Sequence, residues 1–110
     1  MSNDTSFTSI YIIGPEGGPY KIGYAGDPKS RLSNLQVGQA VELKLLYEER
    51  TETTTAKVIE KLIHRNLATK RIRGEWFSVS LEEAIGEVRY AFIRWEDEPN
   101  LTSRYKQKLI

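Results

Sequence analysis

Several side chains in the first third of the chain are of types that carry acid–base or electrostatic chemistry. Tyr11 lies in the run SIYIIG, Lys21 and Tyr24 flank Gly23 in the run YKIGY, and Arg31 follows a few residues later. A guanidinium is a planar, two-pronged donor that suits a phosphate or a phosphorane. A phenol or an amine accepts a proton near neutral pH only when its pKa is lowered. These residue types predict chemistry on a phosphate group, provided that the fold brings them together.

Glu60 is the most informative acid in the sequence, because it lies at the margin of an apolar helical stripe. A carboxylate in that position loses hydration unless it finds a cation. Lys57 or Arg65 could supply the cation as a salt bridge, or a magnesium-type ion could, since such ions prefer oxygen ligands. His64 stands one helical turn beyond Glu60 and shares its side of the helix. We expect His64 to be a hydrogen-bonded neighbour of the site or a phosphate contact.

A basic stripe lies between residues 57 and 73, beside an acidic segment over residues 74–98. Either a solvated helix face or contact with the phosphates of a nucleic acid accounts for such a stripe. Its members, which are our candidate nucleic-acid contacts, are Lys57, Lys61, Arg65, Lys70, Arg71 and Arg73.

A β-hairpin must position the first group of side chains. Residues 9–14 and 20–24 are β-branched and aromatic runs, and the turn sequence PEGGP separates them. Alternation places Tyr24 on one side of the second strand and Lys21 on the other. Opposed side chains in a hairpin come within about 5 Å, so Tyr11 and Lys21 are predicted neighbours.

The next elements carry Arg31 and a third strand. Asp27 is a predicted N-cap, and an apolar spacing continues as a helix over residues 28–36. Alternation over residues 41–49 predicts a strand with Leu45 and Tyr47 on the same, core-facing side.

The second half of the chain is predicted to be mainly helical. A threonine cluster at residues 51–55 opens a helix that runs to about Leu67, and residues 75–79 are a short extended piece. Ser80 and Glu83 form a capping box for a final helix, whose apolar stripe includes Phe92 and Trp95. This order predicts an α+β domain with a small sheet over residues 9–95, a flexible N-terminus at 1–8 and a polar tail at 96–110.

Length and composition narrow the function classes. A chain of 110 residues predicts one domain. It has no cysteine and one histidine, which argues against disulfides and against cysteine- or histidine-based metal cages. The N-terminus MSNDTSFTS does not resemble a signal peptide, and no apolar run of about eighteen residues occurs. We therefore expect a cytoplasmic protein that does not enter a membrane.

The segments SIYIIG, YKIGYAGDPKSRLSNLQ, AKVIEKLIH and GEWF, in this order and spacing, resemble the GIY-YIG nuclease superfamily in the branch common in phage genomes. The resemblance covers residues 9–93. It implies a three-stranded antiparallel sheet flanked by helices, with a C-terminal helix. It also implies divalent-metal-dependent cleavage of DNA, with Mg²⁺ or Mn²⁺ as the cofactor. One active site per chain is compatible with a monomer or a homodimer.

The resemblance assigns roles to three positions. Tyr11 matches the tyrosine of the first motif, Arg31 the arginine of the first helix, and Glu60 the metal-binding glutamate. Where the family usually has its second tyrosine, two residues before Gly23, this chain has Lys21. The general base is therefore Tyr11, Tyr24 or Lys21 at this stage.

Two other functions compete with an active endonuclease. The first is a nucleic-acid-binding domain of the same fold that has lost catalysis and binds through the basic stripe. The second is a phage-encoded protein-interaction module that uses Phe92, Trp95 and the charged tail.

Overall fold

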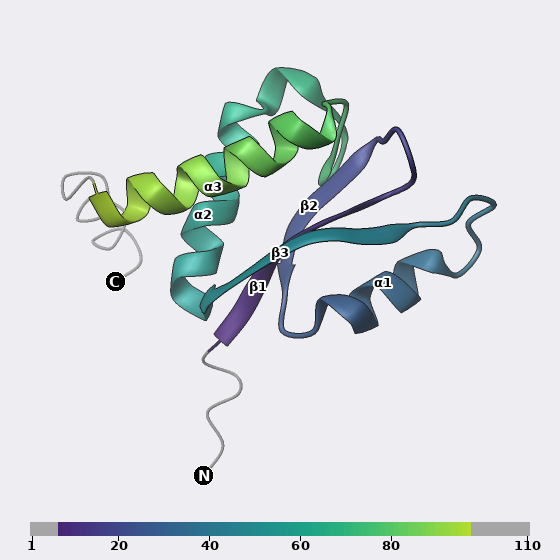
Figure 1. Cartoon of the computed structure of the whole chain (residues 1–110), viewed down its shortest axis with the longest axis horizontal. Helices are drawn as coiled ribbons and strands as arrows, with labels where there is room; N and C mark the ends of the chain where they lie inside the picture. The colour runs from purple at the N-terminus through teal and green to yellow at the C-terminus, as the bar shows by residue number, and fades with distance from the viewer. Residues whose placement is uncertain (1–6, 98–110) are drawn as a thin grey trace, which may run out of the picture.

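The computed structural model describes residues 7–97 and gives an α+β domain (Figure 1). Residues 1–6 and 98–110, and with them most of the predicted flexible N-terminus and polar tail, lie outside the described part. The elements are β1 (Phe7–Gly14), β2 (Tyr20–Ala25), α1 (Pro28–Gln36), β3 (Lys44–Glu52), α2 (Thr53–Asn66), the 3₁₀ turn η2 (Ala68–Lys70), β4 (Arg71–Arg73), β5 (Trp76–Phe77) and α3 (Leu81–Asp97).

The strands form one antiparallel sheet in the order β3-β1-β2-β5-β4. The α+β class is confirmed, but the expected number of three strands is wrong, because five strands pair. The extra strands form a short hairpin about Gly74, whose positive φ of 55° a glycine adopts at little cost. β5 joins the edge of β2 through the pairs Tyr20–Phe77 and Lys21–Trp76. The central hairpin is therefore extended by a small second one.

The two faces of the sheet are covered unequally. α2 and α3 cover one face, whereas α1 alone covers the other (Figure 1). We call the larger apolar cluster, which lies under α2 and α3, the major core, and the smaller cluster beneath α1 the minor core. The major core contains Ile10, Ile12, Ile22, Ile59, Ile63 and Phe77 among others. The buried members of the minor core are Tyr11, Ile13, Ala25 and Leu43.

β1 is the middle strand of the central three, and helices cover both of its faces. Ile10 and Ile12 enter the major core, and Tyr11 and Ile13 enter the minor core. A strand covered on both sides is nearly continuous in apolar residues, as SIYIIG is. The predicted hairpin of β1 and β2 is confirmed, with Tyr11 opposite Gly23 and Ile13 opposite Lys21.

The third strand begins and ends three residues later than the sequence pattern predicts, because Val41 is exposed and lies in the preceding loop. A β-bulge also occurs where Ile12 pairs with Tyr47 and Ile13 with Leu45. The bulge puts one extra residue into β3 at Leu46 and reverses the alternation there. Leu45 consequently packs on the minor core and Tyr47 on the major core, so the prediction that they share a face is wrong.

Helix boundaries follow local capping. The Asp27 carboxylate accepts hydrogen bonds from the backbone N–H groups of Lys29 (3.1 Å) and Ser30 (3.4 Å), which fixes the start of α1 as predicted. The Ser80 hydroxyl accepts one from the Glu83 N–H (3.0 Å) at the start of α3. Within residues 7–97, no helix has the length and apolar character needed to cross a membrane.

Candidate active site

Tyr11 and Arg31 meet on the minor-core side of the sheet. The Tyr11 side chain is fully buried, and its hydroxyl oxygen accepts a hydrogen bond from Arg31 Nη1 at 3.2 Å. Arg31 lies in the first turn of α1, where its N–H donates to the Asp27 carbonyl at 3.1 Å. The Asp27 cap therefore aligns the turn that brings the guanidinium to the tyrosine.

Gly23 has no side chain, which leaves room for the Tyr11 hydroxyl and the Glu75 carboxylate beside it. A Cβ atom on Gly23 would lie 2.9 Å from the Tyr11 hydroxyl and 2.7 Å from Glu75 Oε1. Both contacts are shorter than a Cβ atom tolerates without movement of its neighbours. Glycine at this position of β2 allows the phenol and the Glu75 carboxylate to approach the same point of the backbone.

Lys21 lies on the same face of β2 as Tyr11, diagonally across the hairpin. Its ammonium forms an ion pair with Glu75 Oε1 at 3.0 Å, and only 14% of its side chain is exposed. The ammonium also stands 5.9 Å from the centre of the Trp76 ring, within the range of a cation–π interaction. Held by a carboxylate and an aromatic ring, Lys21 acts here as a cation, which makes it a weaker candidate for the base than its position alone indicates.

Glu60 projects from α2 toward the same group of atoms. The pKa of Glu60 is raised from 4.5 to about 7, first by burial and then by the charge of Glu75 and a hydrogen bond between the two carboxyl groups. The opposing cations are Lys21 and Lys61, rather than the salt-bridge partners Lys57 and Arg65 that the sequence offered. Two carboxyl groups in contact share a proton unless additional positive charge is supplied.

The Tyr11 phenol is held in its neutral form. Burial is the main cause that raises its pKa above the ordinary value of 10.0, and the charges of Glu75 and Glu60 act in the same direction. The Arg31 guanidinium opposes them by charge and by its hydrogen bond. A phenol in this setting accepts a proton from water only after positive charge has been added to the site.

Two of the predicted site residues lie outside this cluster. Tyr24 is on the opposite face of β2 and packs against the major core. His64 Nε2 lies 2.7 Å from the Ile22 carbonyl oxygen, and its ring packs against Phe77 with 5.0 Å between ring centres. Because a carbonyl only accepts, Nε2 must carry the proton and donate it. His64 thus satisfies the Ile22 carbonyl at the edge of β2, just beyond the first residue of β5.

The basic stripe is divided between α2 and the outer hairpin. Lys57, Lys61 and Arg65 are exposed and spaced four residues apart on α2. Lys70 pairs with Glu83 at 2.7 Å, and the Arg71 guanidinium lies 5.9 Å from the centre of the Phe77 ring. Arg71 and Arg73 are exposed on β4 at the edge of the sheet. Lys61 is the member whose charge acts on Glu60.

Glu75 is the functional residue that sequence reasoning missed. It precedes β5, its carbonyl accepts a hydrogen bond from the Ile22 N–H at 3.0 Å, and its side chain contacts Lys21 and Glu60. The run GEWF pointed to this position. Its tryptophan pairs with Lys21, so the acid just before the tryptophan lies near the end of the Lys21 side chain.

The donor atoms in this cluster suit a hard divalent cation. Glu60 and Glu75 supply carboxylate oxygens, and within residues 7–97 no group of three or more histidine, cysteine, aspartate or glutamate side chains is arranged to hold a metal ion. Mg²⁺ commonly uses one or two carboxylates and keeps several waters or substrate oxygens. A carboxyl pair that lacks sufficient positive charge therefore fits Mg²⁺ or Mn²⁺ and does not fit zinc, which takes more protein ligands.

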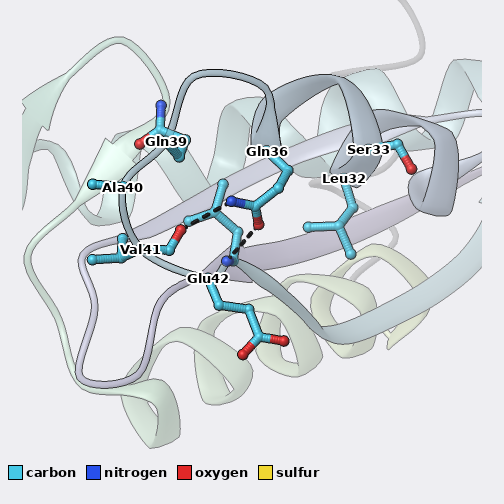
Figure 2. A pocket seen from close by; sticks show the side chains of 8 residues that line it. Leu32, Ser33, Gln36, Gln39, Ala40, Val41 and Glu42 are labelled. Carbon is cyan, nitrogen blue, oxygen red and sulfur yellow. Dashed lines mark hydrogen bonds between the residues drawn. The ribbon is translucent and has the colours of Figure 1, made fainter.

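A hollow lies elsewhere, between the end of α1 and the loop before β3 (Figure 2). The Gln36 side chain closes this loop by donating to the Val41 carbonyl at 3.0 Å and accepting from the Leu43 N–H at 2.8 Å. Its lining contains a single ionisable side chain, Glu42. The side chains that could act as acids, bases or phosphate contacts therefore lie in the Tyr11 cluster and not in this hollow.

Comparison with known protein families assigns the chain to a family. The family model of the T5orf172 domain, a phage-associated domain, matches residues 8–95, so this chain belongs to the T5orf172 domain family. Neither a curated protein nor a solved structure matches the chain.

Proposed function

We propose that this chain is a divalent-metal-dependent endonuclease of the GIY-YIG type that hydrolyses phosphodiester bonds in DNA. One observation carries the proposal. Tyr11 of β1, Arg31 of α1 and Glu60 of α2 come from three separate elements, and the last two both act on Tyr11: Arg31 donates a hydrogen bond to its hydroxyl, and the charge of Glu60 raises its pKa. A phenol, a guanidinium and a carboxylate in this arrangement match the requirements of phosphoryl chemistry.

The proposed division of labour follows from the geometry. Tyr11 is the general base, because its hydroxyl is aligned by Arg31 and lies beside Gly23, where no side chain of that residue separates it from the Glu75 carboxylate. Arg31 is also the group that neutralises charge on the phosphorane, which a bidentate guanidinium does well. Lys21 contributes positive charge to the site and does not remove a proton, because Glu75 holds its ammonium in an ion pair.

Glu60 would hold the divalent ion, which fits the carboxyl pair described above. When bound, Mg²⁺ or Mn²⁺ supplies positive charge to the leaving oxygen and to the neighbouring acid–base groups. The same charge favours the ionised forms of Glu60 and Tyr11, both of which have raised pKa values without it.

The DNA is proposed to pass along the basic stripe. The exposed ends of Lys57, Lys61 and Arg65 lie on the helix that carries Glu60, which places phosphate contacts next to the cleavage site. A cytoplasmic location remains part of the proposal, and the proposal is compatible with action as a monomer or as a homodimer. The interaction-module alternative loses its main surface, because Phe92 is buried and Trp95 packs against the major core.

The proposal is tested by nicking of supercoiled plasmid in Mg²⁺ or Mn²⁺, with wild-type protein, Glu60→Gln and Arg31→Ala. Lys29→Ala and Glu83→Gln are matched controls, because they remove a charge from α1 and from α3 away from the cluster. We expect cleavage by the wild type and the controls only. Equal cleavage by all five proteins, or cleavage by none, would remove the catalytic assignment.

The same variants separate an active enzyme from a binding domain. If cleavage is absent but the protein retards DNA in gels with a steep salt dependence, the nucleic-acid-binding function is correct. The double variant Arg71→Ala/Arg73→Ala then tests the path of the strand. Neutralising two phosphate contacts should lower the slope of log affinity against log salt by about 2. An unchanged slope would show that β4 does not contact DNA.

A further inference from the structure

Glu75 is the residue around which the charged groups of the cluster are arranged. Its Oε1 atom pairs with the Lys21 ammonium at 3.0 Å, and its carboxyl group forms the hydrogen bond with Glu60. The same oxygen lies 2.7 Å from the point where a Gly23 Cβ would be, beside the Tyr11 hydroxyl.

The backbone holds Glu75 firmly in this position. Its carbonyl accepts the Ile22 N–H at 3.0 Å, and the next residue, Trp76, pairs with Lys21 across β2 and β5. The Glu75 side chain thus starts from a fixed point of the sheet, whereas Glu60 starts from α2. Glu75 lies in the turn between β4 and β5, where its carbonyl is bonded to β2, and Glu60 lies on a helix, so the two carboxylates approach each other from separate parts of the backbone.

The balance of charge in the cluster is incomplete. Glu60 and Glu75 would carry two negative charges when ionised, and Lys21 supplies one positive charge through its ion pair, whereas Lys61 is exposed on α2 and acts on Glu60 only through its charge. Arg31 donates to Tyr11 instead. A divalent cation between the two carboxylates would supply the missing charge and use the oxygen ligands that such ions prefer.

We propose that Glu75 is a second direct ligand of the divalent ion, opposite Glu60, and that the Lys21 ammonium competes with the ion for the Glu75 carboxylate. This inference rests on the proposed function, since it concerns the ion that the endonuclease would use. It assigns a role to Glu75 in addition to those of Tyr11, Arg31 and Glu60. It also gives a role to Lys21, which pairs with Trp76 on the neighbouring strand. Lys21 holds the Glu75 carboxylate in place through the 3.0 Å ion pair until the metal binds.

The test is a measurement of Mn²⁺ binding to the full-length protein without DNA, by isothermal titration and by the loss of the free-ion electron paramagnetic resonance signal. Removing a ligand should raise the dissociation constant of Mn²⁺ about tenfold or more, for Glu75→Gln as for Glu60→Gln. Lys21→Met removes the competing cation and should lower the dissociation constant severalfold. Glu83→Gln, which breaks the exposed Lys70–Glu83 pair, is the matched control and should bind Mn²⁺ as the wild type does.

The outcomes separate the inference from the proposed function. If Glu60→Gln weakens Mn²⁺ binding and Glu75→Gln does not, Glu75 only anchors Lys21, and the inference is wrong while the endonuclease proposal stands. If the wild type binds no Mn²⁺ at millimolar concentrations, with or without a DNA duplex, both fail. Circular dichroism and thermal unfolding of each variant establish that it is folded, and Lys21→Met gives a result in the opposite direction that misfolding cannot imitate.

Discussion

The two faces of the sheet have different tasks. The major core, under α2 and α3, is made almost entirely of apolar side chains, and its polar groups are at its margins. The minor core, under α1, has only four buried members, and one of them is Tyr11. Its open end carries Arg31, Lys21 and Glu75. One face therefore supplies most of the burial, and the other supplies the polar groups of the cluster except Glu60, which comes from α2.

This difference shows how a small domain accommodates a polar site without losing its stability. Neighbouring residues of a strand point to opposite faces, so β1 gives alternate side chains to the two cores. Ile10 and Ile12 secure the strand from one side while Tyr11 is presented on the other. The position of the phenol is as rigid as the major core, although the site itself adds little apolar burial.

The largest effect should come from truncating the major core. Ile12→Ala should lower the free energy of unfolding by about 3–5 kcal/mol, because it leaves a cavity among tightly packed neighbours. Ile13→Ala, one residue on and equally buried, should cost about 2–3 kcal/mol, because α1 is the only helix above it and can settle into the space. Urea unfolding followed by circular dichroism measures both. Equal losses would mean that the two faces contribute alike.

Arg31→Ala should show the reverse pattern, with a large loss of activity and a small loss of stability. Removing an electrostatic group from the transition state commonly costs about 10²–10³ in rate, or about 3–4 kcal/mol. The hydrogen bond to Tyr11 should add about 1 kcal/mol or less to the free energy of unfolding. Plasmid cleavage rates and urea unfolding of the same preparation test this, with Lys29→Ala as the control. A stability loss as large as that of Ile12→Ala would place Arg31 among the structural residues.

Glu60 should make stability depend on pH. Its pKa is raised from 4.5 to about 7, so between these values the folded protein binds a proton that the unfolded chain has released. Stability conferred by this group therefore falls as pH rises from 4.5 to 7, and below 4.5 both states are protonated. The full shift corresponds to about 3 kcal/mol, and partial exposure to solvent reduces the expected effect to about 1–2 kcal/mol.

Glu60→Gln removes this titration, so the variant should gain stability relative to the wild type at pH 8 and lose that advantage at pH 4.5. Urea unfolding of both proteins at the two pH values measures the difference. A constant difference between the two proteins at both pH values would show that the Glu60 carboxyl is solvated as an ordinary acid.

The smallest effect is expected for the lysine–glutamate pair outside the cluster. Lys70 and Glu83 are 2.7 Å apart, with 45% and 37% of their side chains exposed. Such surface pairs contribute about 0–1 kcal/mol, so Lys70→Ala should change the free energy of unfolding by less than about 1 kcal/mol. A double-mutant cycle with Glu83→Ala measures the coupling. Strong coupling would mean that η2 and α3 are joined more firmly than exposure indicates.

Local signals in the sequence predicted much of this fold. The turn sequence after Gly14, the Asp27 cap and the Ser80 cap each depend on residues close together in the chain, and all were located correctly. The bulge at Leu46 was not predictable, because it depends on how β3 pairs with a strand more than thirty residues away. For the same reason the pattern gave the wrong face for Tyr47.

The site was predictable only in part. Tyr11, Arg31 and Glu60 could be named, the last because an acid at the margin of an apolar stripe is conspicuous. Their cation partners could not be predicted, since the ion pair of Lys21 with Glu75 requires the register of β5 against β2. Tyr24 could not be excluded from sequence, because choosing between the two faces needs the positions of α1 and α2.

The bulged strand β3 also bears on how copies of this protein can associate. β3 lies at one edge of the sheet and carries the charged residues Lys44, Glu48, Glu49, Arg50 and Glu52, while the opposite edge is the three-residue strand β4 with Arg71 and Arg73. Irregular pairing, short length and like charge all oppose the addition of another strand at an edge. Two molecules that act together on one duplex would accordingly meet through helices or loops, and a continuous intermolecular sheet is not expected.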